Sequence, residues 1–180
     1  MSLGLYLHIP YCFSKCRYCD FYSAPGQRGV PRAYVDALLR ELSRFAPDAP
    51  LRPDTLYFGG GTPSLLDPAD AARLIAAAQP LPGAEITLEA NPETVTEDSL
   101  RAFREAGVNR ISFGVQSARD SQLKTLGRPH TARQARAAFA AARRAGFTNI
   151  SGDIMLALPH YTQAEFDETL ELIAEGGATH

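Results

Sequence analysis

Three cysteines, Cys12, Cys16 and Cys19, lie within eight positions of one another, and the chain has no others. This C-x3-C-x2-C spacing places three thiols on one short loop, an arrangement that suits an iron–sulfur cluster held by thiolates. Three thiolates leave one iron of a four-iron cluster without a protein ligand. An open metal position is where a small molecule binds and reacts. The motif therefore predicts a reactive iron–sulfur centre.

A disulfide and a zinc site are the alternatives for these thiols. A disulfide would leave one thiol over, and it would join cysteines too close together on a loop for good geometry. A zinc ion would take the three thiolates with His8 as the fourth ligand, although structural zinc sites usually combine a C-x2-C pair with a second, distant pair. The zinc-binding structural domain is kept as a hypothesis of another class.

The chain of 180 residues is 45% hydrophobic, enough for a single domain that spans 1–180. A net charge of −2 gives no basic field, so no nucleic-acid partner is expected. An apolar run of the roughly 20 residues that a membrane helix needs is absent from the sequence, and so are the features of a signal peptide. We expect a cytoplasmic protein, because that compartment keeps thiols reduced.

Strand and helix patterns alternate along the chain. Strands are expected at 3–9, 54–58, 85–90, 110–116 and 149–158, and helices at 32–46, 68–78, from Thr94 or Thr96 to 103, at 120–126, 131–144 and from 162 to Gly176. This alternation predicts an α/β fold with a parallel sheet and right-handed crossovers. The sequence stops where a sixth strand would begin, so we expect the N-terminal part of a longer protein.

Several of these strands have one apolar side and one small or polar side. Ligands of α/β folds bind at the carboxyl ends of the strands. The cysteine loop, the glycine run 59–61, Glu89 and Gln116 all fall at such ends. Asp153 is expected deeper in the sheet, because its strand is predicted to continue to 158. Arg128 offers a forked, charge-assisted hydrogen bond to a ligand carboxylate.

Three of these polar residues also have a purely structural alternative. Glu89 would pair with Arg110, and Gln116 would cap loop backbone. Arg128 would be a solvated loop arginine. His130 and His160 are expected to be ordinary loop histidines.

The cysteine loop, with Tyr18 just before its last cysteine, resembles the radical S-adenosylmethionine (radical SAM) superfamily. The resemblance implies a partial (β/α)6 barrel, of which about five βα units are present here. It implies a 4Fe-4S cluster on Cys12, Cys16 and Cys19, with the amino and carboxylate groups of SAM on the open iron. In that family the reduced cluster cleaves the sulfonium to a 5′-deoxyadenosyl radical.

The resemblance extends over most of the chain, through 57–63, 89–92, 107–117, 126–128 and 153–159. Matched position by position, it implies a set of residues that contact SAM. These are Tyr6, Tyr18, Gly60, Gly61, Thr62, Glu89, Gln116, Arg128 and Asp153.

Within the superfamily, the match is to haem chaperones of the HemW type and to oxygen-independent coproporphyrinogen III dehydrogenases. In the dehydrogenases the cysteine motif looks like C-x3-C-x2-C-x-C, and an N-terminal extension precedes it. Here Phe21 replaces the fourth cysteine, and the first cysteine is already residue 12. Both points favour a haem chaperone, with the dehydrogenase as the alternative. The resemblance implies haem or porphyrin as ligand, an electron donor such as flavodoxin or ferredoxin, respiratory haem proteins as acceptors, and peripheral membrane association of the full-length protein.

Overall fold

Five parallel strands in chain order form the sheet of the computed structural model, which describes residues 2–45, 50–158 and 161–180. The strands are β1 (Gly4–Ile9), β2 (Thr55–Gly60), β3 (Glu85–Ala90), β4 (Arg110–Gln116) and β5 (Asn149–Ile154). Each strand pairs with the next one along the chain, as successive right-handed crossovers produce. The expected α/β architecture of about five βα units is confirmed.

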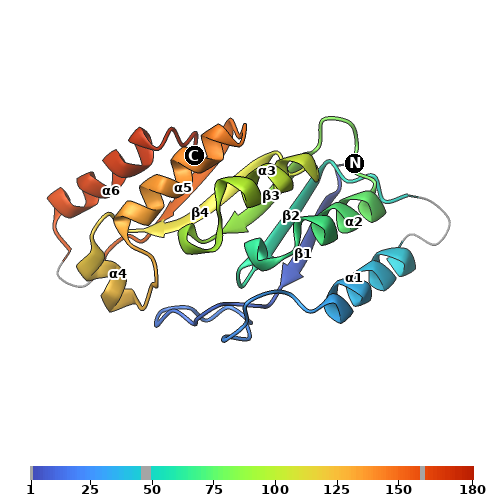
Figure 1. Cartoon of the computed structure of the whole chain (residues 1–180), viewed down its shortest axis with the longest axis horizontal. Helices are drawn as coiled ribbons and strands as arrows, with labels where there is room; N and C mark the ends of the chain where they lie inside the picture. The colour runs from blue at the N-terminus through green and yellow to red at the C-terminus, as the bar shows by residue number, and fades with distance from the viewer. Residues whose placement is uncertain (1, 46–49, 159–160) are drawn as a thin grey trace.

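The helices lie along one side of the sheet (Figure 1). They are α1 (Arg32–Phe45), α2 (Pro68–Ala78), α3 (Glu97–Glu105), α5 (Ala132–Arg144) and α6 (Gln163–Glu175), whereas the short α4 (Asp120–Leu126) follows the carboxyl end of β4. Two 3-10 turns, η1 (Pro63–Leu65) and η2 (Pro92–Thr94), follow β2 and β3. None of the described helices is long and apolar enough to cross a membrane.

Most helix starts occur where the capping residues predict them. The Asp67 side chain accepts a hydrogen bond from the Ala69 N–H, and Thr131 and Thr162 each form a capping box. Thr96, not Thr94, caps α3, because its hydroxyl accepts from the N–H of Ser99 while the Ser99 hydroxyl accepts in return from the N–H of Thr96.

The fifth strand is shorter than the prediction of 149–158. It ends at Ile154, after which the N–H of Met155 donates to the carbonyl of Gln116 and Ala157 has a positive φ of 56°. A left-handed backbone cannot continue a strand. Asp153 therefore lies at the carboxyl end of β5 and not deeper in the sheet as expected. Pro159 and His160 lie outside the described residues.

The helix-facing side of the sheet contributes most of the core. Fully buried side chains on this side include Leu56, Phe58, Leu88, Ile111 and Phe113. Beyond α6, the Thr179 N–H donates to the Ile150 carbonyl at 2.8 Å, and the Gly152 N–H donates to the His180 carbonyl at 3.0 Å. The last residues therefore run beside β5, where a sixth strand was expected.

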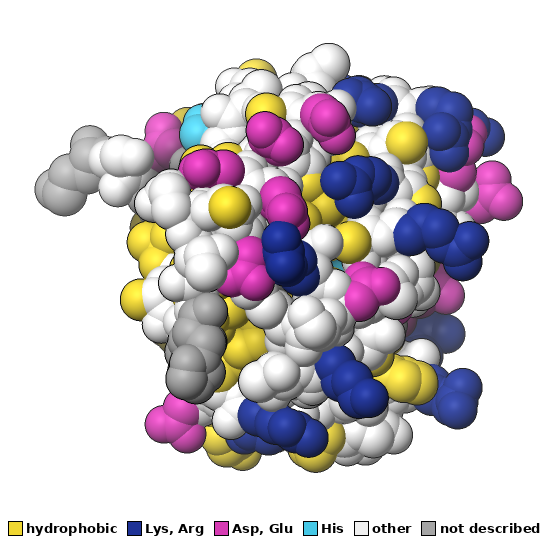
Figure 2. Space-filling view, turned by 90° about the vertical axis from the view of Figure 1, so that its left-hand side faces the viewer, with side chains coloured by type: hydrophobic (Ala, Val, Ile, Leu, Met, Phe, Trp, Pro, Cys, Tyr) yellow, Lys and Arg dark blue, Asp and Glu magenta, His cyan; other side chains and the backbone are white. Residues whose placement is uncertain are grey.

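Charges of both signs are mixed on the face that carries α4 and α6 (Figure 2). On this face Arg119 forms ion pairs with Glu168 at 2.6 Å and Glu165 at 3.2 Å. The mixture agrees with the small net charge and gives no extended basic surface here.

Phe139 provides a test of the core. It is fully buried on α5 and packs edge-to-face against Phe113, with the ring centroids 5.3 Å apart. We expect Phe139→Ala to lower the free energy of unfolding by about 3–5 kcal/mol in urea denaturation. Phe45→Ala is the matched control, because Phe45 is 77% exposed; it should change stability by less than about 0.5 kcal/mol. Equal losses in the two variants would contradict this packing.

Candidate functional site

A pocket of about 260 Å³ opens at the carboxyl ends of the strands, under the cysteine loop. Its walls bring together all the residues expected from the sequence except Tyr6. These are Cys12, Cys16, Cys19, Tyr18, Gly60, Gly61, Thr62, Glu89, Gln116, Arg128 and Asp153. Tyr6 does not line the pocket, and its hydroxyl lies 3.0 Å from Nδ1 of His8.

The cysteine loop is fixed to the rest of the fold by backbone hydrogen bonds. The Cys12 N–H donates to the Ala24 carbonyl at 3.0 Å, which closes the base of the loop. The Arg17 N–H donates to the Leu126 carbonyl at the end of α4, at 2.9 Å. The Thr62 N–H donates to the Tyr11 carbonyl at 2.8 Å. The loop therefore has anchors on both sides of the pocket.

The glycine run packs directly against this loop. A Cβ placed on Gly61 would lie 2.7 Å from the Tyr11 carbonyl oxygen and 2.9 Å from Sγ of Cys12. Both distances are shorter than real Cβ contacts, so position 61 requires glycine for close approach of two backbones. A simple tight turn would not impose this requirement.

Glu89 is held by donors from the neighbouring strand. The Tyr57 hydroxyl donates to Oε1 at 2.8 Å, and the Gly60 N–H donates to Oε2 at 3.2 Å. The predicted alternative partner, Arg110, donates instead to Thr87 at 3.3 Å. Burial raises the pKa of Glu89, and these two donors oppose the rise.

Asp153 faces the same pocket from β5. The Ser112 hydroxyl donates toward its carboxyl oxygens, at 3.2 and 3.4 Å. Although its side chain is reached by solvent through the pocket, the surrounding protein atoms raise the pKa of Asp153 by reducing its hydration. The charge of Asp153 also raises the pKa of Glu89. The two carboxylates therefore favour a cationic or hydrogen-bond-donating ligand between them.

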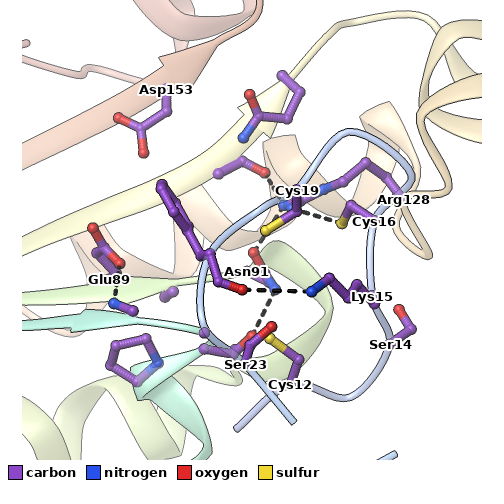
Figure 3. A pocket seen from close by; sticks show the side chains of 18 of the residues that line it. Cys12, Ser14, Lys15, Cys16, Cys19, Ser23, Glu89, Asn91, Arg128 and Asp153 are labelled. Carbon is purple, nitrogen blue, oxygen red and sulfur yellow. Dashed lines mark hydrogen bonds between the residues drawn. The ribbon is translucent and has the colours of Figure 1, made fainter. Parts of the chain in front are cut away.

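Arg128 lies on the opposite side of the pocket with Cys16 and Cys19 (Figure 3). It is half-buried, which corrects the alternative of a solvated loop arginine. Its guanidinium donates to Oδ1 of Asn91 at 2.8 Å, to the Gly114 carbonyl, and to Sγ of Cys16 at 3.5 Å. Its Nε is buried and has no hydrogen-bond partner among the described residues. The guanidinium is thus charged and held in place, and part of its hydrogen-bonding capacity is unused, as expected of a group that binds a carboxylate.

Gln116 ends β4 with a left-handed backbone, at a φ of 67°, where the register between β4 and β5 shifts. Its backbone carbonyl accepts from Met155, while its side-chain amide lines the pocket. The amide is therefore placed at the pocket and does not cap loop backbone, as the alternative role required.

Two histidines differ from simple expectation. His8 uses both ring nitrogens, one with the Tyr6 hydroxyl and the other with the Tyr22 carbonyl, each at 3.0 Å. It therefore does not offer a zinc ion its fourth ligand. His130 is buried, not an ordinary loop residue: its Nε2 lies 3.1 Å from the Val115 carbonyl and its Nδ1 lies 3.4 Å from Glu93.

The residues present fit both groups that the cysteine motif implies. All three thiols line one pocket, although no three His, Cys, Asp or Glu side chains in the described ranges stand close enough to hold a single metal ion. A cluster makes no such demand, since each thiolate binds a different iron. Arg128 and Ser23 line the same pocket, and each has a buried polar atom, Nε and Oγ respectively, without a hydrogen-bond partner among the described residues, as expected where a polar ligand completes a site.

Sequence reasoning did not assign three residues that organise this pocket. Tyr57 holds Glu89, Ser112 holds Asp153, and Asn91 holds Arg128. Side-chain alternation does place Asn91 and Ser112 on the polar side of the sheet, and this signal would have found them. Tyr57 lies on the same side of β2 as Gly59. Its bond to Glu89 could not be foreseen, because that pairing depends on the register between β2 and β3.

The Tyr57–Glu89 bond gives a test of the pocket's electrostatics. The hydroxyl stabilises the ionised carboxylate, so Tyr57→Phe should raise the pKa of Glu89 further above that of an ordinary glutamate. The measurement is an NMR titration of the Glu89 side-chain carbon. Tyr34→Phe is the control, because the Tyr34 hydroxyl donates to the His8 backbone carbonyl instead. A lower or unchanged pKa in Tyr57→Phe would refute the assignment.

The chain is similar in sequence to known proteins over most of its length. The heme chaperone HemW of Escherichia coli is 44% identical over 169 residues, which cover 91% of this chain and 45% of that protein. The mitochondrial radical S-adenosyl methionine domain-containing protein 1 of Bos taurus is 41% identical, with 87% of this chain and 36% of that protein covered. This chain therefore spans less than half the length of these relatives.

Among solved structures, the coproporphyrinogen III oxidase HemN of Escherichia coli, described as a radical SAM enzyme, has a TM-score of 0.86 at 32% identity. The match covers 98% of this chain and 42% of that one. The family model described as the Radical SAM superfamily matches residues 6–173. The chain belongs to the radical SAM superfamily.

Proposed function

We propose that Cys12, Cys16 and Cys19 bind a 4Fe-4S cluster and that the pocket beside them binds SAM. The observation that carries this proposal is the division of one pocket into two sides. Thiols and the Arg128 guanidinium form one side, and the Glu89 and Asp153 carboxylates form the other (Figure 3). SAM has the matching set of groups, a carboxylate together with an ammonium, a sulfonium and ribose hydroxyls.

Each wall of the pocket has a distinct task in this proposal. Arg128 binds the carboxylate of SAM through the N–H groups that its protein partners leave free. Glu89 and Asp153 accept hydrogen bonds from the ammonium or hydroxyl groups, which relieves the cost of their partial desolvation. The backbone of Gly60 to Thr62 lies along the ligand, because no side chain intervenes at 60 and 61. When bound, the reduced cluster supplies the electron that cleaves the sulfonium bond.

For the whole protein, we infer a haem chaperone that binds haem and delivers it to respiratory haem proteins. The chain's similarity to proteins named heme chaperone HemW supports this inference, as does Phe21 in place of a fourth cysteine. Residues 1–180 would then be the radical SAM core domain of a longer cytoplasmic protein that associates peripherally with membranes. Flavodoxin or ferredoxin would supply the electrons.

The second candidate is an oxygen-independent coproporphyrinogen III dehydrogenase. The close structural match to HemN supports it, because the two folds agree over 98% of this chain. Phe21 argues against it, because the motif of the dehydrogenases looks like one with a cysteine at this position. A zinc-binding structural domain is a weaker alternative, because both ring nitrogens of His8 are engaged elsewhere.

Iron analysis tests the cluster. We expect about four iron and four sulfide per chain after anaerobic reconstitution, and neither in the variant with all three cysteines changed to alanine. Ser43→Ala, at an exposed position on α1, is the control and should retain the full content. Zinc in place of iron in the wild-type protein would contradict the cluster and support the structural zinc domain.

Haem titration and a turnover assay separate the two biological candidates. The full-length, cluster-loaded protein is expected to bind haem and to leave coproporphyrinogen unchanged under anaerobic, reducing conditions with SAM present. The readouts are the haem absorption spectrum and chromatography of the porphyrin products. Conversion to protoporphyrinogen would assign the protein to the dehydrogenases instead.

A further inference from the structure

Asn91 connects two walls of the pocket, the end of the glycine run and Arg128. Its Nδ2 donates to the Thr62 hydroxyl at 3.2 Å, at the end of the glycine run. Its Oδ1 accepts from the Arg128 guanidinium at 2.8 Å. One half-buried amide is therefore bonded to the segment that follows β2 and to the arginine that follows α4, and Figure 3 shows it in the pocket.

Gly114 is a second residue that holds the Arg128 guanidinium in place. Its carbonyl accepts from the same guanidinium nitrogen as Asn91 does. A Cβ on Gly114 would lie 2.8 Å from that nitrogen of Arg128, and 3.2 Å from both Oδ1 of Asn91 and Nε2 of Gln116. Because Gly114 has no side chain, these three polar groups of the pocket have room to meet there.

An unrestrained arginine samples many rotamers and loses that freedom when it binds a ligand. Arg128 is already held by Asn91, Gly114 and Cys16, so its guanidinium does not need to be ordered at the moment of binding. Its buried Nε has no hydrogen-bond partner among the described residues, so the protein leaves the guanidinium incompletely satisfied.

We propose that Asn91 and Gly114 are positioning residues, which fix Arg128 for the ligand carboxylate and tie it to Thr62 on the glycine run. This inference rests on the proposed binding of SAM. It assigns to this chain two residues that act through Arg128, without requiring that either touch SAM.

The test uses the full-length, cluster-loaded protein and equilibrium dialysis with radiolabelled SAM. Asn91→Ala is expected to weaken SAM binding about tenfold, the scale of one charge-assisted hydrogen bond. Asn149→Ala is the matched control, because Asn149 lies at the amino end of β5 and bonds Glu85. It should bind SAM as the wild type does. Unchanged affinity in Asn91→Ala would overturn the inference.

A double-mutant cycle shows whether Asn91 acts through Arg128. In an Arg128→Ala background, adding Asn91→Ala should weaken binding less than about twofold, because the group that it positions is gone. A full tenfold loss in both backgrounds would mean a general structural effect and would overturn the proposal. The electron paramagnetic resonance signal of the reduced cluster without SAM should be the same in wild type and Asn91→Ala, with the difference appearing only when SAM is added.

Gly114→Ala provides an independent route that keeps the proposal testable if Asn91→Ala fails to fold. It should displace the guanidinium and weaken SAM binding at least as much. Gly29→Ala is its control, since a Cβ there would meet only the Leu65 carbonyl, at 3.9 Å. Wild-type affinity in Gly114→Ala would overturn the inference. Absence of SAM binding by the wild-type protein would overturn the proposed function as well, so the two failures are distinguishable.

Discussion

The site depends on backbone hydrogen bonds that hold the cysteine loop above the ends of the strands. The bond from Thr62 to Tyr11 joins the loop to the end of β2, and the bond from Arg17 to Leu126 joins it to the end of α4. Neither bond involves a thiol. The protein therefore specifies the position of the loop through its own fold, and the cysteines need to contribute only their chemistry.

The electrostatics of the pocket follow from the polar side of the sheet. Glu89 and Asp153 have raised pKa values because protein atoms replace part of their hydration. A raised carboxylate pKa makes the folded state less stable as the pH rises through that folded-state pKa, since the charged form is the one that burial opposes. Donors on neighbouring strands, Tyr57 and Ser112, reduce this cost without removing it. The protein thus keeps two partly hydrated carboxylates at the place where a cationic ligand would bind.

The sequence predicts whatever depends on local pattern. Capping at Thr131 and Thr162, the alternation of strands with helices, and the polar side of β3 and β4 could all be read from nearby residues. Contacts between distant residues could not. Arg128 bonds Cys16 across 112 positions and Asn91 across 37, and these bonds depend on how the segment after α4 lies against the cysteine loop and the end of β3. The early end of β5 could not be read from nearby residues either, because alanine at 157 gives no sign of its left-handed backbone.

The left-handed backbone at Gln116 sets a limit on how the protein can be improved. A residue with a Cβ loses roughly 1–2 kcal/mol in this conformation, a cost that glycine avoids. Selection for thermal stability alone would favour glycine at 116, and that substitution would delete the amide from the pocket. At position 116, the substitution that would raise thermal stability is therefore also the one that would remove a polar group from the pocket. A stabilised form of the protein should be sought by changing other residues.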